Sequence, residues 1–128
     1  MKFTVDNVQY NALVTSLNRS ARIKESKLSG DVKSGRHFRD LVGTYYDYDM
    51  EIATDRLSRA EYDSLYDVLT APVESHSVIL PYGRTTLQFD AYIQSVDDSY
   101  IADNGTDRLW GNLSVKFYAI KPQRRPTP

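Results

Sequence analysis

Acidic side chains are the most abundant groups in this chain that could take part in catalysis. A glycosidase-like site needs two carboxyl groups flanking a cleft, one of them shielded from water so that it keeps its proton. Asp47, Asp49 and Glu51 alternate within "YYDYDMEIA", so they share one face of a strand. We expect that face to be exposed, which would leave all three carboxyl groups solvated. A hydrolase with paired carboxylates is therefore not favoured.

Two histidines, His37 and His76, are the other candidates for acid–base chemistry. A catalytic histidine needs a partner that orients it and a reacting group within hydrogen-bond reach. His37 lies in a basic segment flanked by glycine, and His76 stands at the start of a predicted strand. Neither belongs to a motif of defined spacing, and the chain has no G-x-S-x-G sequence. We expect both to be structural, and we assign no catalytic residue.

Four aspartates surround a predicted Asn104-Gly105 turn and loosely resemble the composition of a calcium loop. They are Asp97, Asp98, Asp103 and Asp107. The ordered D-x-[DN]-x-[DN]-G spacing is missing, and the chain has no cysteine to bind a metal through sulfur. Glycine loops for phosphate or dinucleotides are also missing. The sequence therefore predicts neither a metal nor a cofactor.

Aromatic residues offer a different kind of site. Trp110 and Tyr118 share the outward face of the last predicted strand, and together with Tyr92 of the preceding hairpin they could form a patch for a sugar or a peptide. An outward tryptophan is equally expected at a protein–protein interface. Trp110 could also lie simply beneath Tyr62 or Tyr66 of the helix described next.

One helix and several strands would position these groups. Ser58 followed by Glu61 fits a capping box, and the apolar residues after it recur at helical spacing: Tyr62, Leu65, Tyr66 and Leu69. Pro72 prevents continuation, so the helix is predicted over about 58–70. The stretch before it alternates, with Tyr46, Tyr48, Met50 and Ile52 facing inward and Tyr45 sharing the acidic face.

A hairpin and a final strand follow the helix. "HSVILPYGRTTLQFDAYI" alternates on both sides of a Pro81–Gly83 turn. "RLWGNLSVKFYAI" places Leu113, Val115, Phe117 and Ala119 inward and Trp110 outward. The sequence therefore predicts a mainly β (α+β) domain over residues 1–121, an antiparallel barrel or sandwich of five to seven strands with one helix. Residues 122–128 form an extended, basic, proline-rich tail.

The N-terminal third is less regular. Short strands are predicted around an Asp6-Asn7 turn, and "ALVTSLNRSARI" fits a strand or a helix equally well. Glycine and basic residues, among them Lys33, Arg36 and Arg39, indicate a mobile loop at 26–39. We expect this loop to be disordered before assembly, because it has few apolar anchors.

Charge is distributed unevenly although the net charge is only −1. Residues 1–44 carry eight Lys/Arg and four Asp/Glu, residues 45–107 three and thirteen, and residues 108–128 five and none. Such asymmetry either reflects ordinary solvated surfaces or allows acidic and basic surfaces to meet between copies. The dispersed basic residues disfavour nucleic-acid binding. No run of about 18 apolar residues suggests a membrane span, and the first residues do not resemble a cleaved signal peptide.

The order of elements resembles a known family. "FTVDNVQY", the basic loop, "LVGTYYDYDMEIA", the helix "SRAEYDSLYDVLTAP", the hairpin and a last strand ending in "KFYAIKPQRRP" resemble small tail proteins of long-tailed phages. They are similar to the tail-tube-like β-barrel domain of tube subunits, distal tail proteins and baseplate hub components. The sequence departs from the pattern of this family in two ways. It shows no clear long hairpin of the kind that lines a tail tube, unless residues 26–39 or 97–108 form one. It also shows no receptor-binding or lysin extension.

The resemblance implies a mechanical, non-enzymatic function. Such domains form rings, commonly hexameric or trimeric with pseudo-sixfold symmetry, by joining sheet edges around a channel. It also implies contacts with neighbouring tail proteins, DNA only as non-specific passage through the channel, and location in the virion after synthesis in the host cytoplasm. The expected contact residues are Lys33, Arg36, Arg39, Asp47, Asp49, Glu51, Trp110, Arg124 and Arg125. The alternative is a small β-sandwich module that binds carbohydrate or peptide through Tyr45, Tyr92 and Trp110.

Overall fold

A computed structural model describes residues 1–53, 57–103, 105 and 108–126 of the chain. These residues form ten strands and one helix, which confirms the predicted mainly β class. Eight strands belong to one antiparallel sheet that is not closed into a barrel, so the described sheet has more strands than expected. The other two strands make a separate ribbon.

The large sheet consists of two halves that share the last strand, β10 (Arg108–Ala119). The first half has the order β2 (Val8–Asn11), β1 (Lys2–Val5), β7 (His76–Tyr82) and β8 (Thr85–Tyr92), which pairs with the end of β10. The second half has the order β3 (Leu13–Glu25), β6 (Leu41–Ala53), β10 and β9 (Val96–Asp103). Strand β10 leaves β6 after Phe117 and continues along β8, so it links the two halves.

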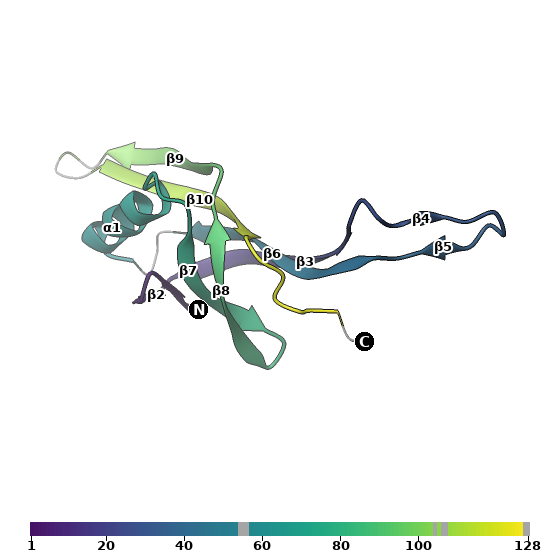
Figure 1. Ribbon diagram of the computed structural model, residues 1–128. Helices are drawn as coiled ribbons and strands as arrows, with labels where there is room; N and C mark the ends of the chain where they lie inside the picture. Colours follow the sequence, from purple (N-terminus) through teal and green to yellow (C-terminus); the bar gives the residue numbers. More distant parts are fainter. Residues whose placement is uncertain (54–56, 104, 106–107, 127–128) are drawn as a thin grey trace.

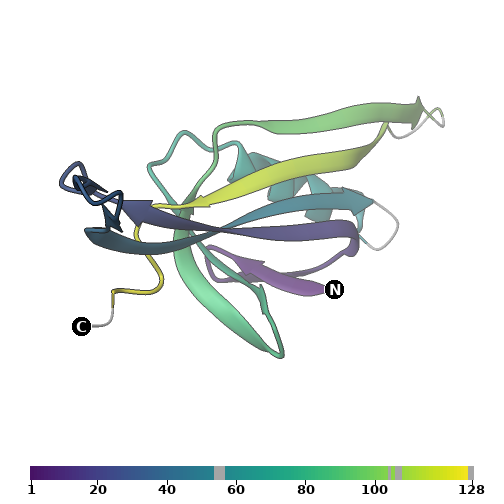
Figure 2. The ribbon, with the colours of Figure 1, turned by 90° about the vertical axis from the view of Figure 1, so that its right-hand side faces the viewer.

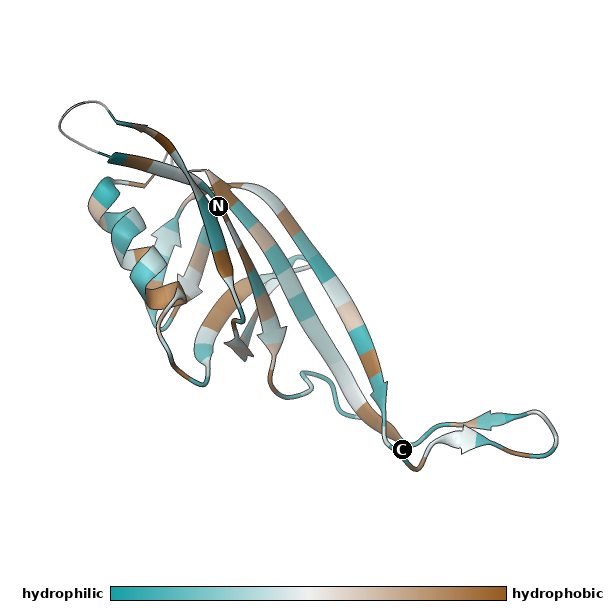
Figure 3. Cartoon of the chain, turned by 90° about the horizontal axis from the view of Figure 1, so that it is seen from above, coloured by the Kyte–Doolittle hydropathy of each residue, from teal (hydrophilic) through white to brown (hydrophobic). Residues whose placement is uncertain are grey.

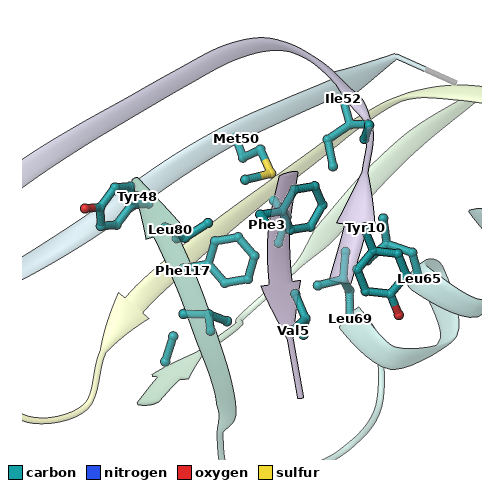
Figure 4. Packing of buried hydrophobic residues seen from close by; sticks show 14 of the residues in the cluster. Phe3, Val5, Tyr10, Tyr48, Met50, Ile52, Leu65, Leu69, Leu80 and Phe117 are labelled. Atoms are coloured by element: carbon teal, nitrogen blue, oxygen red, sulfur yellow. The ribbon is translucent and has the colours of Figure 1, made fainter. Parts of the chain in front are cut away.

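Both halves contribute to a single core, shown in Figure 4. Met50, Ile52 and Phe117 come from the second half, whereas Val5 and Leu80 come from the first. The inward positions predicted for β6 and β10 are therefore confirmed from Tyr48 onward and from Leu113 onward. Burial of these apolar side chains is the main stabilising contribution.

Helix α1 (Arg59–Leu69) closes one side of this core (Figure 1). Both hydrogen bonds of the predicted capping box are present: Glu61 N donates to Ser58 Oγ, and Ser58 N donates to Glu61 Oε1. Tyr62, Leu65 and Leu69 are buried. The helix prediction is confirmed because local capping and apolar spacing specify the same segment.

Two predicted turns are also present. Asp6 and Asn7 have φ values of 50° and 68° between β1 and β2, and Gly83 has φ 58° between β7 and β8. His76 is buried and its Nδ1 lies 2.6 Å from Asp6 Oδ2, while Ser77 N donates to Asp6 Oδ1. His76 therefore fixes the first turn against β7, the structural role expected for it.

The main departure from the predicted fold is a long projecting hairpin. Strands β3 and β6 pair from Leu13↔Ala53 to Glu25↔Leu41, and β4 (Gly30–Asp31) and β5 (His37–Phe38) extend them as a small ribbon. Figure 1 shows this hairpin reaching well outside the body of the domain. The predicted loop at 26–39 contains two short paired strands that the sequence analysis did not expect, because the pairing set by β3 and β6 continues into it. Its disorder before assembly stays a prediction.

Candidate assembly surfaces

Two strands leave an open edge on the same half-sheet. Among the described residues, β3 pairs only with β6 and β9 pairs only with β10, so each has one free side. In Figure 2 the four strands cross the view with β9 uppermost. A free side presents a row of unpaired backbone N–H and C=O groups that can add another strand. Strand β3 has 13 residues and β9 has 8, long enough for specific pairing.

The two edges carry opposite charge. Strand β9, "VDDSYIAD", contains three aspartates and no basic residue. Strand β3, "LVTSLNRSARIKE", contains Arg19, Arg22 and Lys24 against the single acid Glu25. Opposite potentials attract two surfaces and set their register, whereas two identical edges of like charge would repel. A β3 edge therefore matches a β9 edge better than it matches another β3.

The β3 edge and the β9 edge are also displaced relative to each other along the strand direction. Leu17 pairs with Met50, Met50 with Val115 and Val115 with Val96, so these four residues stand at one level. From that level β3 continues for eight residues toward the projecting hairpin, and β9 runs the other way. Copies joined through these edges would each be shifted along the strands, and such a shift tilts the strands of a closed sheet.

The projecting hairpin exposes apolar side chains. Of the ten large hydrophobic residues exposed in the described chain, five lie on it: Ile23, Leu28, Val32, Phe38 and Leu41. Figure 3 shows brown, apolar stretches on this segment outside the body. Half of the exposed apolar side chains are thus concentrated in one extension, which is typical of a contact surface with another molecule.

The basic residues predicted to contact partners have different positions on the hairpin. Lys33 and Arg36 lie exposed at its tip, where the backbone turns through a hydrogen bond from Gly35 N to Val32 O. Arg39 forms an ion pair with Glu25 across the base of the ribbon. Lys33 and Arg36 are available to a partner, while Arg39 already has one within the chain.

His37 lies between two carboxylates on the ribbon. Its Nδ1 is 2.8 Å from Asp31 Oδ1 and its Nε2 is 3.0 Å from Glu25 Oε2. Both ring nitrogens can donate only when the imidazole is protonated. The hydrogen bonds to Asp31 and then Glu25 accordingly raise the pKa of His37, and hydrogen bonds from Arg39 and then His37 lower the pKa of Glu25.

We expect the order of the ribbon to depend on pH. The stabilisation of the ribbon by protonated His37 is complete when the pH is below the ordinary histidine pKa. It is lost as the pH rises through the raised pKa of His37. The stabilisation of the ribbon by ionised Glu25 is complete when the pH is above the ordinary glutamate pKa. It is lost as the pH falls through the lowered pKa of Glu25. Heteronuclear NOE values of the β4 and β5 amides should therefore be highest between about pH 5 and 6. His37→Gln should remove the change above pH 6.5; unchanged NOE values up to pH 8.5 in the parent chain would contradict this assignment.

The acidic face predicted for β6 is only partly exposed. Glu51 is exposed and Asp49 is half-buried, but Asp47 is only 7% exposed, so the prediction for Asp47 is wrong. Asp47 Oδ2 accepts from Arg22 Nε at 2.6 Å, and Asp47 Oδ1 accepts from Ala119 N at 3.0 Å. The Arg22 guanidinium also covers the Tyr45 ring, which buries Tyr45 on the same face. Alternation along one strand could not reveal this cover, because it comes from β3 and β10.

The C-terminal tail, which the sequence predicts to be extended, is docked on β6 through residues 123 and 124. Thr44 N donates to Arg124 O, and the Gln123 side-chain amide exchanges two 3.0 Å hydrogen bonds with the Tyr46 backbone. These contacts occupy the side of β6 that β10 has left. The Arg124 and Arg125 side chains remain exposed, and residues 127 and 128 lie outside the described part.

Gly43 is the residue that allows the tail to approach. Its φ is +148°, and an added Cβ would lie 2.5 Å from Arg124 O and 2.6 Å from Pro122 Cβ. Sequence reasoning missed this contact, although a lone glycine in a strand pattern is itself a signal of close backbone approach.

A second aromatic group lies where the tail meets the β7–β8 turn. Tyr82 Oη donates to Tyr46 Oη at 3.1 Å, and Arg19 lies 5.3 Å from the centre of the Tyr82 ring. The Tyr82 hydrogen bond and, next, the Arg124 guanidinium lower the pKa of Tyr46. These contacts fix the base of the projecting hairpin to the tail and to the first half of the sheet.

Trp110 lies in a hollow of about 160 Å³ between α1 and the β9–β10 pair. Its other lining residues are Tyr62, Asp63, Tyr66 and Asp98. Burial and a 2.9 Å hydrogen bond to Asp98 raise the pKa of Tyr62. The expectation that Trp110 lies beside Tyr62 or Tyr66 of the helix is confirmed. Its assignment by simple alternation to the outward face of the strand is wrong, because the β9–β10 register shifts between Gly111 and Ser114, where Asn112 has φ 54°. Such a bulge turns the residues before it to the other face.

The proposed patch of Trp110 with Tyr92 and Tyr118 does not form. Tyr92 and Tyr118 stack at 5.1 Å, whereas Trp110 packs edge-to-face against Tyr100. Tyr118 lies eight positions along β10 from Trp110, roughly 26 Å of strand. Tyr45, Tyr92 and Trp110 therefore share no common surface for a sugar or peptide.

No metal-binding cluster of three His, Cys, Asp or Glu residues occurs in the described part of the chain. Asp97 and Asp98 are the second and third residues of β9 and Asp103 is its last, while Asn104 and Asp107 lie outside the described residues. Gly105 N donates to Asp103 Oδ1. The part of the chain that the structure describes contains no helix long and apolar enough to cross a membrane.

The charged and aromatic residues considered above are thus spread over several surfaces of the domain. The most extended of these features is the pair of open, oppositely charged edges of β3 and β9. Comparison with protein families and with curated proteins finds no sequence match for this chain.

Proposed function

We propose that the chain is a non-enzymatic structural subunit of a phage tail, in the tube, distal-tail or baseplate region, that assembles into a ring around the tail channel. The observation that carries this proposal is the pair of open edges, β3 and β9, on one half-sheet. Each is unpaired along one side in the described chain, and the two differ in charge. A structure that exposes both ends of the same sheet can add copies of itself in one direction.

Joining β3 of one copy to β9 of the next continues the antiparallel alternation. Neighbouring strands from β3 through β6 and β10 to β9 alternate in direction, so β9 and β3 run oppositely. The contact is heterologous, which produces a closed ring when the rotation between copies completes a circle. Each subunit would supply four strands to a continuous wall, and pairing would satisfy the backbone groups left open in the monomer.

The projecting hairpin supports the same proposal. The resemblance to tail-tube-like domains implies a long hairpin near the channel, and β3–β6 with its ribbon has that form (Figure 1). Its exposed Leu28, Val32 and Phe38 would be covered by a neighbouring copy or by an adjoining tail protein. The face of the wall opposite to α1, which includes Asp49 and Glu51, would line the channel and limit DNA to non-specific passage.

Oligomeric mass and ring shape test the proposal. Analytical ultracentrifugation of the purified chain over a range of concentrations should show a closed species of several copies, and electron microscopy should show rings. A chain that stays monomeric at every concentration and binds glycans on an array would contradict the proposal and support a binding module.

Salt should weaken the assembly. The charged groups of the β3 and β9 edges are near the surface, so their attraction is screened at high ionic strength. Raising sodium chloride from about 0.05 M to about 1 M, where the screening length falls to about 3 Å, should shift the equilibrium toward monomer. Ultracentrifugation at both concentrations measures this shift. Equal or stronger association at high salt would indicate an apolar contact instead.

A further inference from the structure

The hollow beside α1 is acidic and aromatic, and it lies next to the open β9 edge. Its described lining residues, Tyr62, Asp63, Tyr66, Asp98 and Trp110, include two carboxylates, three rings and no cation. We propose that this hollow is a socket for one arginine side chain of the neighbouring copy, Arg19 on its β3 strand. This inference rests on the ring assembly proposed above and specifies how adjacent subunits recognise each other.

The chemistry of the hollow favours a guanidinium group. Trp110 is 42% exposed, so its ring is open to a planar cation, for which tryptophan is the preferred aromatic partner. The Tyr62 hydroxyl donates to Asp98 Oδ2 at 2.9 Å, which holds that carboxylate in place. A volume of about 160 Å³ is smaller than the pockets of roughly 300–1,000 Å³ that enclose small-molecule ligands, and it is suited to a single side chain.

Arg19 lies on the matching face of the opposite edge. It pairs with Tyr48, whose side chain is buried in the core, so Arg19 shares the core-facing side of β3. Asp98 shares the same side of its own strand, because it bonds to Tyr62 of α1. Arg19 is exposed and forms no ion pair within the described residues; its guanidinium lies over the Tyr82 ring. Assembly would exchange that contact for an aromatic ring together with two carboxylates.

The strand register that sets Asp98 opposite Arg19 of the neighbouring copy gives a strand tilt that is usual for closed sheets. Val96 stands at the level of Leu17, which places Asp98 near the level of Thr15 in the same copy. Setting Asp98 opposite the neighbour's Arg19 shifts each copy by about four residues, or about 13 Å of strand. Four strands are about 19 Å wide, so the strands would tilt by about 35°, at the lower end of the usual range for closed sheets. The shift is even, so both side chains stay on one face.

Disulfide trapping tests this register directly. The chain has no cysteine, so introduced thiols have no competitors. In the proposed register Asn18 lies opposite Ser99 of the next copy, on the face away from α1. Oxidation of the Asn18→Cys, Ser99→Cys double variant should give a ladder of linked species that ends at the closed ring. The Asn18→Cys, Asp103→Cys pair is offset by about 13 Å and should not link, since disulfides require Cα atoms within about 7 Å.

The socket itself is tested by charge removal, with the single tryptophan as reporter. Arg19→Gln and Asp98→Asn should each weaken assembly about tenfold, the size expected when one charged hydrogen bond is lost. Both should abolish the change in Trp110 fluorescence that accompanies assembly. Asp98→Asn keeps an acceptor for Tyr62, so the hollow should stay folded. Arg84→Gln, another exposed arginine, lies on the β7–β8 turn and should change neither quantity.

The outcomes separate the two proposals. Rings that form normally with Arg19→Gln, with an unchanged Trp110 response, would overturn the socket and leave ring assembly intact. Linking of the offset cysteine pair in place of the proposed one would overturn this register. A parent chain that stays monomeric, with no linked species from either pair, would overturn ring assembly and the socket with it.

Discussion

Replacing Asp47 with alanine should lower the free energy of unfolding by about 3 kcal/mol. Asp47 is almost fully buried and accepts hydrogen bonds from Arg22 and from the backbone N–H of Ala119. Alanine would leave the Ala119 N–H without a partner in the interior, and it would separate β3 from the point at which β10 crosses to β8. A denaturant titration followed by circular dichroism measures the loss.

Two further variants of strand β6 separate the contribution of the Asp47 charge from that of its hydrogen bond to Ala119. Asp47→Asn keeps an oxygen acceptor for Ala119 but removes the charge, so about half of the loss should remain. Asp49→Ala removes a half-buried carboxylate on the same face, opposite Lys116, and should cost about 0.5 kcal/mol or less. Equal losses for Asp47→Ala and Asp49→Ala would show that Asp47 has no special structural role.

Replacing Gly43 with alanine should detach the C-terminal tail and cost about 3 kcal/mol. The new Cβ would overlap the Arg124 carbonyl oxygen and Pro122, and alanine is strained at a φ of +148°. Because the obstructing atoms include backbone, the tail must move, and the hydrogen bonds between Thr44 and the tail backbone break with it. Hydrogen exchange of the Thr44 and Tyr46 amides should become markedly faster, since both amides donate to the tail.

Gly83 provides the matched control. It also has a positive φ, +58°, but an added Cβ there meets nothing within 4 Å. Gly83→Ala should therefore cost only the backbone strain, about 1 kcal/mol, and should leave exchange at Thr44 and Tyr46 unchanged. If Gly43→Ala and Gly83→Ala gave the same loss and the same exchange pattern, the close approach of the tail would not contribute to stability.

Both predictions concern the base of the projecting hairpin. Asp47 fixes β3 to the end of β10, and the tail occupies the side of β6 that β10 has left. These contacts hold the β3 edge and the hairpin in a defined direction relative to the body. A subunit that assembles through this edge needs such stiffness, because a mobile strand would lose more entropy on pairing.

Local patterns in the sequence determined the elements whose signals are contained within a few residues. The capping box and apolar spacing gave helix α1, alternation gave the inward faces of β6 and β10, and turn residues gave the β1–β2 and β7–β8 hairpins. Each of these signals depends only on residues that are close together in the chain. The tertiary structure preserved the elements that they predicted. The same local patterns, several alternating stretches and one helical stretch, together predicted the mainly β class with a single helix.

Tertiary structure decided the features that depend on distant segments. Strand β3 has no decisive periodicity, and pairing with β6 makes it a strand and extends the hairpin into 26–39. Asp47 is polar and alternates to the outward face, but Arg22 and Ala119 bury it. A bulge at Asn112 turns Trp110 toward α1. Which edges stay open, and which charges lie on them, follows from strand order, and strand order is set by contacts that no local stretch of sequence records.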